Sequence, residues 1–326
     1  MNGYGSGGTA TPSAGKNDVT FIDYDGTILY SYSLEEAKAL TELPELPIHD
    51  GLVCQGWNWS LEAIKALNRP VTVGAMYITD NGATRLHIRI ATMGRMTVPL
   101  YIGQTVANGV SIDWGDGSTV ETLAGTGCVN TSHTYAEPGD YVISLMPNDG
   151  CTLYLGANSS SYCVMGPTES NSKVYCNMLQ DVSIGKNVTS ISNYSFNSCC
   201  SLASIIIPDG VTSIGNYAFQ SCYSLASIII PDGVTSISNH SFNSCHSLAS
   251  IIIPDGVTSI GVGAFAFCYG MRYYDFSACT SIPTLSSTNA FNNIPSDCQM
   301  LIPAALYDEW SAATNWATYA SKMVAV

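Results

Sequence analysis

Two carboxylates lie close together near the N-terminus of the 326-residue chain, in the segment Phe21-Ile-Asp-Tyr-Asp-Gly-Thr27. Neighbouring carboxylates could act as a nucleophile and as an acid or base. The structural alternative is a turn, because Asp25-Gly26 between two apolar runs is a strong signal for a β-hairpin.

The segment resembles the D-x-D-G-T nucleophile loop of haloacid-dehalogenase-type phosphatases. The resemblance implies that Asp23 would attack the phosphorus, Asp25 would act as acid and base, and Mg²⁺ would be held between them. That chemistry needs a parallel α/β sheet, a lysine that neutralises the phosphate and further carboxylates for the metal. The module offers only Lys38 and Lys65, no Asp-Asp pair and about 60 residues, whereas each βαβ unit takes about 30. The hairpin is therefore the preferred interpretation, and a phosphatase that uses Asp23 is kept as the enzyme alternative.

Other polar residues give no catalytic or metal-binding pattern. Asp113, Asp116 and Asp140 could bind Ca²⁺, but they lack the ligand density of a dedicated calcium loop. A role in turns is preferred for them, and calcium binding is left open. The five histidines share no metal-ligand spacing. The sequence therefore predicts no catalytic residue, no metal and no cofactor, and a chain that is not an enzyme.

The C-terminal half contains a repeat of 23 residues, of which one copy reads IIIPDGVTSIGNYAFQSCYSLAS. The frame L-x-x-I-x-I-P-x-x-V-x-x-I-x-x-x-A/S-F-x-x-C resembles the BspA-like class of leucine-rich repeats. That resemblance implies a solenoid of stacked coils. The complete copies are Val182–Ser204, Ile205–Ser227, Ile228–Ser250 and Ile251–Tyr273.

The apolar frame positions predict the core of each coil. Pro208–Gly210 would turn the chain after a short strand, Ile205–Ile207, so each coil is expected to add one strand at about 4.8 Å spacing. One coil cannot bury its apolar face, so several must stack. The residues expected to point inward in one coil are Leu202, Ile205, Ile207, Val211, Ile214, Phe219 and Cys222.

Both ends of the solenoid need a cap. Lys173–Gln180 leads into the first coil, and the degenerate stretch Tyr274–Asp297 follows the last complete copy. A strand at Met300–Pro303 and an amphipathic helix at Ala304–Ala313 would come next. Two tryptophans of this tail, Trp310 and Trp316, are predicted to cover the open end of the core.

Four of the twelve cysteines, one in each complete copy, recur at the repeat interval: Cys199, Cys222, Cys245 and Cys268. Free cysteine is among the most buried residue types and behaves as a small hydrophobe. The spacing therefore predicts a buried column of free thiols. Disulfide pairing of the other eight is left open.

Two columns of the repeat vary while the frame stays fixed. One reads Tyr194, Tyr217, His240 and Gly263, and the other reads Cys200, Tyr223, His246 and Tyr269. The variation is either drift or tuning of a contact surface. Aromatic and imidazole side chains give a large contact area at low entropic cost. The candidate binding surface is therefore Tyr194, Tyr217, Tyr223, His240, His246 and Tyr269.

The segment Thr84–Leu155 is β-rich. Val110–Ser118 (VSIDWGDGS) and His133–Leu145 (HTYAEPGDYVISL) resemble the two signatures of PKD-type β-sandwich modules. The resemblance implies that Trp114 packs inside a sandwich. Asp116-Gly117 would form a hairpin turn.

The first module, Asp18–Thr79, is expected to be α+β. It offers two strands, Val19–Tyr24 and Thr27–Tyr32, on either side of the hairpin turn. A capping box at Ser33–Glu36 would open a short helix. A second helix is expected at Ser60–Leu67, before a proline.

Composition excludes several partners. Charged residues are 11%, with 11 Lys plus Arg and a formal charge of −14, so clustered cations for nucleic acid or an anionic membrane are missing. No apolar run reaches the length of roughly 18 to 20 residues that spans a bilayer.

Met1–Lys16 has no apolar core typical of a signal peptide and is interpreted as a flexible tether.

The sequence thus predicts a multidomain, mainly β chain, built as a string of separate modules. The divisions are a tether at 1–17, a small α+β module at 18–80, a PKD-like β-sandwich at 81–160, a linker and N-terminal cap at 161–181, BspA-like leucine-rich repeats at 182–273, and a degenerate repeat with a C-terminal cap at 274–326.

This order of modules resembles proteins encoded by gut bacteria and their phages or prophages. The expected function is structural and adhesive, as a phage virion appendage or decoration protein that presents the repeats to a host-surface glycan or protein. A bacterial cell-surface adhesin is the alternative. The location would be a virion or an extracellular surface, with other virion or surface proteins bound through the N-terminal region. Formation of a homo-oligomer is left open.

Overall fold

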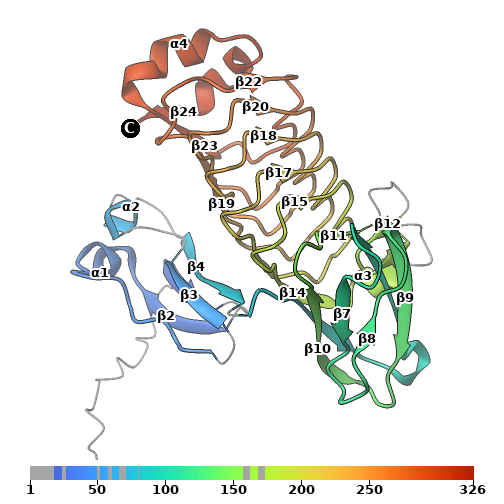
Figure 1. Cartoon of the computed structure of the whole chain (residues 1–326). Helices are drawn as coiled ribbons and strands as arrows, with labels where there is room; N and C mark the ends of the chain where they lie inside the picture. The colour runs from blue at the N-terminus through green and yellow to red at the C-terminus, as the bar shows by residue number, and fades with distance from the viewer. Residues whose placement is uncertain are drawn as a thin grey trace, which may run out of the picture.

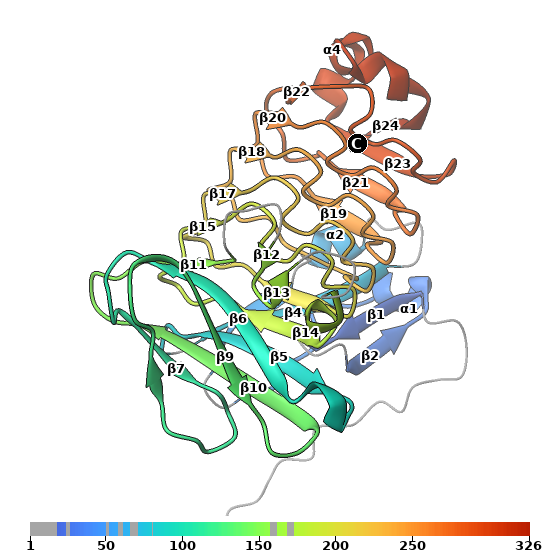
Figure 2. The same ribbon diagram turned by 90° about the vertical axis from the view of Figure 1, so that its right-hand side faces the viewer.

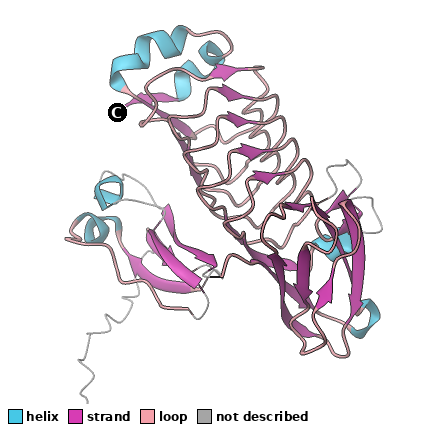
Figure 3. Ribbon diagram, viewed as in Figure 1, coloured by secondary structure: helices cyan, strands magenta, loops and turns pink. Residues whose placement is uncertain are grey.

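The computed structural model describes residues 18–23, 27–49, 52–57, 61–65, 71–79, 81–156, 162–167 and 173–326. A small α+β module, a β-sandwich and a long solenoid follow one another along the chain (Figure 1). Strands dominate and the helices are short (Figure 3). The predicted mainly β fold class is therefore confirmed. The predicted tether lies outside the described residues.

The first module is a four-stranded sheet with two short helices. Its strands have the order β2-β1-β4-β3, and β1 pairs antiparallel with β2 but parallel with β4. The predicted hairpin is therefore confirmed, while its turn, residues 24–26, lies outside the described residues. Strands β3 and β4 were not predicted. The elements are β1 (Val19–Ile22), β2 (Ile28–Tyr32), α1 (Leu34–Lys38), β3 (Leu52–Trp57), α2 (Leu61–Lys65) and β4 (Val71–Thr79).

The capping box opens α1 as predicted. The N–H of Glu36 donates to Ser33 Oγ at 3.3 Å, and the N–H of Ser33 donates to Glu36 Oε2 at 2.8 Å. These two bonds satisfy N–H groups that have no partner within the helix. Ala37 of this helix is buried against the core of the module, which is centred on Phe21.

The middle of the chain is a β-sandwich of two sheets (Figure 2). One sheet contains β5, β10, β7 and β8 side by side, and the other has the order β11-β6-β9. Trp114 and Tyr135 are buried between them, and the Tyr135 hydroxyl donates to the Trp114 carbonyl at 2.9 Å. The strands are β5 (Thr84–Ile90), β6 (Thr97–Gln104), β7 (Val110–Asp113), β8 (Glu121–Thr122), β9 (Gly127–Thr134), β10 (Gly139–Pro147) and β11 (Leu153–Leu155), with a 3₁₀ turn, η1 (Met93–Arg95).

The sandwich and the solenoid are joined by one continuous sheet. Strand β14 (Leu179–Ser183) pairs antiparallel with β5 of the sandwich and parallel with β16 (Ser204–Ile206) of the first coil. The sandwich and the solenoid are therefore continuous at this junction, at the end of the segment 161–181 that the sequence predicted as a linker and N-terminal cap. The pairing satisfies the backbone groups of β14 on both sides. Before β14 come β12 (Tyr162–Cys163), β13 (Gly166–Pro167) and the helix α3 (Lys173–Cys176).

The solenoid carries two columns of short parallel strands rather than the single column expected. One sheet has the order β15-β17-β18-β20-β22, and a second has the order β19-β21-β23-β24. Equivalent residues pair across coils, as Ile191 does with Ile214. The strands are β15 (Ser190–Ile191), β17 (Ser213–Ile214), β18 (Ser236–Ile237), β19 (Ser250–Ile252), β20 (Ser259–Ile260), β21 (Tyr273–Asp275), β22 (Thr284–Leu285), β23 (Gln299–Ile302) and β24 (Met323–Ala325).

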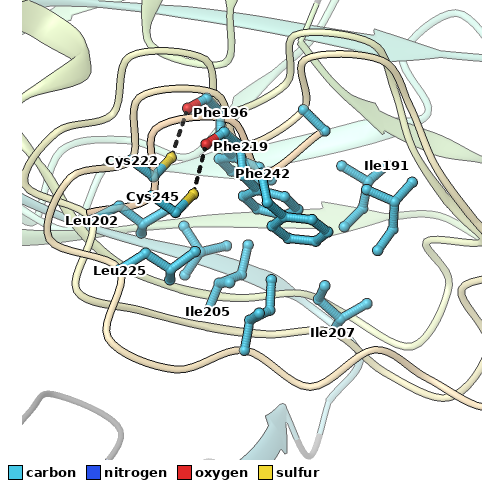
Figure 4. Close-up of a cluster of buried hydrophobic side chains, with 14 of the residues drawn as sticks. Ile191, Phe196, Leu202, Ile205, Ile207, Phe219, Cys222, Leu225, Phe242 and Cys245 are labelled. Atoms are coloured by element: carbon cyan, nitrogen blue, oxygen red, sulfur yellow. Dashed lines mark hydrogen bonds between the residues drawn. The ribbon is translucent and has the colours of Figure 1, made fainter. Parts of the chain in front are cut away.

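The inward-pointing residues predicted for the coil are all buried. Phe196, Phe219 and Phe242 stack above one another with ring centroids 5.3 and 5.4 Å apart (Figure 4). The thiols of Cys222 and Cys245 lie beside them and donate to backbone carbonyls of the preceding coil. The repeat cysteines therefore form the predicted buried column.

The C-terminal cap covers the last coil. Trp310 and Trp316 are fully buried, and Trp316 Nε1 donates to the Pro283 carbonyl at 2.7 Å. The single helix expected here is divided into a 3₁₀ turn, η2 (Ala304–Leu306), and α4 (Tyr307–Ala312), followed by η3 (Trp316–Lys322). Across the described part of the chain, no helix combines the length and apolar character that crossing a membrane requires.

Candidate binding surface

The candidate residues lie in the segment of each repeat that follows its strand in the β15-β17-β18-β20-β22 sheet. The N–H groups of Tyr217, Phe219 and Ser221 donate to carbonyls of the next coil at 2.8 to 3.0 Å. Tyr217 and Ser221 have positive φ angles of 58° and 60°. This conformation is costly for a residue other than glycine, and the bonds between coils hold it in place. Because it recurs in every coil, equivalent side chains point in the same direction.

Three of the candidates form one stack, the Tyr194 ladder, made of Tyr194, Tyr217 and His240. Consecutive ring centroids are 4.8 Å apart, with interplanar angles of 6° and 12°. The ladder ends at Gly263, whose φ is +60° and where an added Cβ would lie 2.5 Å from the His240 ring. The His240 imidazole thus occupies the space that a side chain at position 263 would need. Glycine suits this position because it has no Cβ and because it tolerates a positive φ.

The other three candidates form a second stack, the Tyr223 ladder, made of Tyr223, His246 and Tyr269. Tyr223 and His246 are 4.5 Å apart and nearly parallel, while His246 and Tyr269 are 5.0 Å apart and tilted by 35°. Tyr223 is 42% exposed and Tyr269 is 57% exposed. The structure therefore brings the six candidates together as two ladders of three.

Stacking decides which parts of these rings remain available to a ligand. The faces of the middle rings, Tyr217 and His246, are covered by their neighbours, so these rings offer edges to the solvent. An edge presents a hydroxyl or an imidazole nitrogen together with apolar ring carbons. Tyr269 ends its ladder and has a more exposed ring. The sequence alone suggested broad aromatic contact, whereas the structure offers mainly ring edges.

Two rings of the Tyr194 ladder, Tyr194 and His240, are uncharged near neutral pH. Burial lowers the pKa of His240 below its usual value, so its ring is neutral at pH 7. Burial, with a smaller contribution from Tyr217, raises the pKa of Tyr194. The ladder therefore combines neutral donors and acceptors with apolar surface.

A hollow of about 380 Å³ that the sequence did not predict lies at the junction of the sandwich and the first two coils. Its lining includes Tyr154 of the sandwich and Asn193 of the first coil. Asn193 Oδ1 accepts the N–H of Asn216 from the next coil at 2.7 Å. Because Tyr194 follows Asn193 in sequence, the Tyr194 ladder begins beside this hollow.

A second hollow, of about 460 Å³, lies on the other side of the repeats. It is lined by the Pro-Asp-Gly turns and by Ile229 and Ile252 of neighbouring coils. Each turn is closed by a bond from the N–H of the following valine to the proline carbonyl, as in Val234 to Pro231 at 3.0 Å. Asp232 and Asp255 therefore lie in turns.

Asp23 lies at the end of β1, in the hairpin rather than in an open catalytic cleft. It is 6% exposed, and its Oδ2 is 2.8 Å from His49 Nε2. Its N–H donates to the Thr27 carbonyl across the hairpin. Asp25, the second carboxylate of the phosphatase alternative, is outside the described residues. Of the two carboxylates, Asp23 alone lies within the described residues, and it contacts His49.

The three sandwich aspartates do not converge on one site. Asp113 and Asp116 accept N–H groups two residues further along, at 2.9 and 3.0 Å, which is the geometry of aspartate turns. Asp140 instead pairs with Arg89 at 2.8 Å. Hydrogen bonds from Ser118 and His133 lower the pKa of Asp116 to about 2.

The sequence model of the BspA type leucine-rich repeat region matches residues 169–296, in six copies. This part of the chain is a BspA-type leucine-rich repeat region. The match extends beyond the four complete copies, into the N-terminal cap and the degenerate stretch. It is a match to a repeat scaffold and not to a catalytic domain, in agreement with the prediction that the chain is not an enzyme.

Solved structures give partial matches. A leucine-rich cell surface protein from Faecalibacterium prausnitzii is 29% identical over 49% of this chain and 40% of its own, with a TM-score of 0.39. A leucine-rich repeat protein from Bacteroides ovatus is 30% identical over 36% of each chain, with a TM-score of 0.29. The T. pallidum leucine-rich repeat protein is 28% identical over 41% of this chain and 70% of its own, with a TM-score of 0.31. No curated protein matches the chain.

Proposed function

We propose that this chain is a non-catalytic adhesive protein that binds an uncharged glycan on a cell surface through the Tyr194 and Tyr223 ladders. The observation that supports this most directly is the row of ring edges, one per coil, at intervals of 4.5 to 5.0 Å. Each interior edge places a hydroxyl or an imidazole nitrogen beside apolar carbons. A glycan presents the matching pattern, hydroxyl groups alternating with C–H surface.

The stacked rings are also preorganised for binding. A side chain held between two neighbours has already lost most of its rotamer freedom, so a ligand loses less entropy when it binds. Tyr269 adds an exposed ring on which a terminal sugar could stack. With only 11 Lys plus Arg in the chain, a neutral glycan fits this surface better than an anionic one.

The proposed location is the outside of a cell, with the chain acting as a surface adhesin. The virion appendage predicted from the sequence stays a prediction, as do partners bound through the N-terminal region. Immunogold labelling of intact cells and of purified phage particles from the same culture distinguishes the two. Labelling confined to the particles would contradict the cell-surface proposal.

Binding is tested with the full chain on an array of neutral and acidic glycans and on whole cells. We expect replacement of Tyr217, Tyr223, His240 and His246 together by serine to weaken attachment at least tenfold, about 1.4 kcal/mol, while circular dichroism stays unchanged. Val120→Ser, at a 54% exposed valine of the sandwich, is the matched control. Unchanged attachment by the fourfold variant would show that the ladders are not the binding surface. Binding to a protein but to no glycan on the array would refute the proposal that the ligand is a glycan.

A further inference from the structure

Three buried cysteines meet where the sandwich, the N-terminal cap and the first coil join. Cys163 comes from β12, Cys176 from α3, and Cys199 from the first repeat. All three are completely buried, and their Sγ atoms lie within 4.8 Å of one another. The Sγ atoms of Cys163 and Cys176 are 2.8 Å apart. In the part of the chain that the structure describes, this is the only group of three or more potential metal ligands.

This cluster departs from the pattern of the repeat thiols. Cys222, Cys245 and Cys268 each donate to a phenylalanine carbonyl 26 residues earlier at 3.2 Å. Cys176 lies 23 residues before Cys199 and so continues the column into the cap, and Cys163 stands beside both. Because Cys163 lies outside the repeat period, the packing of the coils does not account for its place in this cluster.

We propose that Cys163 and Cys176 form a disulfide that fastens the N-terminal cap, with Cys199 packed against it as a free thiol. A disulfide bond of 2.03 to 2.05 Å requires the two sulfurs to approach by less than 1 Å. In the reaction, both thiols lose a proton and together give two electrons to a small-molecule disulfide. One thiolate attacks that disulfide, the second displaces the small thiol, and the Sγ–Sγ bond forms as two small thiols are released.

Charge favours this bond over a metal ion. Zinc or copper would need thiolates, and three thiolates in an apolar site would leave a net negative charge far from water. Burial strongly raises the pKa of Cys163 and of Cys199, which opposes their ionisation. A disulfide carries no charge. Because buried neutral thiols react slowly, the bond would form during folding, before the cap closes over it.

The bond would stabilise the cap at this end of the core, as the two tryptophans do at the other. The cysteines are 13 positions apart in sequence, so the crosslink closes a short loop and removes freedom from the unfolded chain. Fastening α3 to the β12–β13 hairpin would keep the first coil covered. This inference does not depend on the ladders.

Peptide mapping tests the pairing directly. The full chain is purified without reductant, denatured in the presence of an alkylating reagent, digested and analysed by mass spectrometry. We expect one crosslinked pair that joins Cys163 to Cys176, with Cys199 alkylated. Alkylation of all three, a pair that contains Cys199, or one equivalent of zinc or copper in elemental analysis of the native protein would each overturn the proposal.

Thermal unfolding tests the consequence. Protein refolded with reductant should melt roughly 5 °C or more below protein refolded with a mixture of reduced and oxidised glutathione. The double variant Cys163→Ala/Cys176→Ala should show no such difference. Cys245→Ala, which removes a buried repeat thiol outside the cluster, should keep the full difference. A difference of the same size in the double variant would overturn the assignment.

Discussion

Replacing Phe219 by alanine tests whether the solenoid core is a continuous stack of rings. Phe219 is fully buried between Phe196 and Phe242, at centroid distances of 5.3 and 5.4 Å. Truncating a buried phenylalanine costs about 3 to 5 kcal/mol. The upper part of that range applies here, because bonds such as Phe219 N–H to the Ser241 carbonyl at 2.8 Å hold the coils in place. The cavity therefore collapses little, and we expect a loss of about 4 to 5 kcal/mol.

The assay is urea unfolding of the full chain, followed by circular dichroism and by hydrogen exchange of the repeat amides. Coils contact only their neighbours, so protection should fall most in the coils next to Phe219. Tyr223→Ala is the matched control, because Tyr223 also stacks on the next coil but is 42% exposed. It should cost about 1 kcal/mol or less. A loss below about 1 kcal/mol for Phe219→Ala, or a loss equal to that of the control, would refute the stacked-core reasoning.

Three further predictions concern a glycine, a histidine and a thiol. Gly215→Ala should lower the stability by about 1 to 3 kcal/mol in thermal unfolding, because the added Cβ would lie 2.5 Å from a backbone nitrogen of the preceding coil. Gly210→Ala is the control and should be close to neutral, because its added Cβ would lie 3.5 Å from the nearest atom. The hydrogen bond to Asp181 raises the pKa of His87 above 6.5. The contribution of protonated His87 to the stability of the fold should therefore be complete below pH 6.5 and lost as the pH rises through the raised pKa. His87→Gln should remove this pH dependence in thermal melts at pH 6 and 8.5. Cys222, whose thiol is buried and whose pKa is strongly raised, should be alkylated in native protein only as fast as the chain opens, and fast alkylation would contradict its burial.

Some local features of the fold could be predicted because they depend on neighbours in sequence. The hairpin that starts at Val19, the capping box at Ser33 and the turn at Pro208–Gly210 each arise within a few residues. The six candidate ladder residues were also identifiable. A strict period places equivalent side chains above one another once the coils stack.

Pairings between distant segments could not be predicted in the same way. Strand β14 joins the sandwich to the first coil, and His87 contacts Asp181 across 94 residues. The single sequence contains no signal that matches these partners. The same limit applies to Cys163 and Cys176. Cys176 lies one period before Cys199, but Cys163 lies outside the repeat period, and nothing in the sequence matches the two.

The sequence by itself determined the solenoid, because a 23-residue period in the apolar frame can bury its core only by stacking coil upon coil. It also determined which columns vary, and hence where a binding surface was to be sought. Only the tertiary structure decided what that surface offers. Stacking at 4.5 to 5.0 Å covers the faces of the middle rings and leaves their edges to solvent. Ring orientation follows from the positive-φ backbone and the bonds between coils, which exist only once neighbouring repeats are in place.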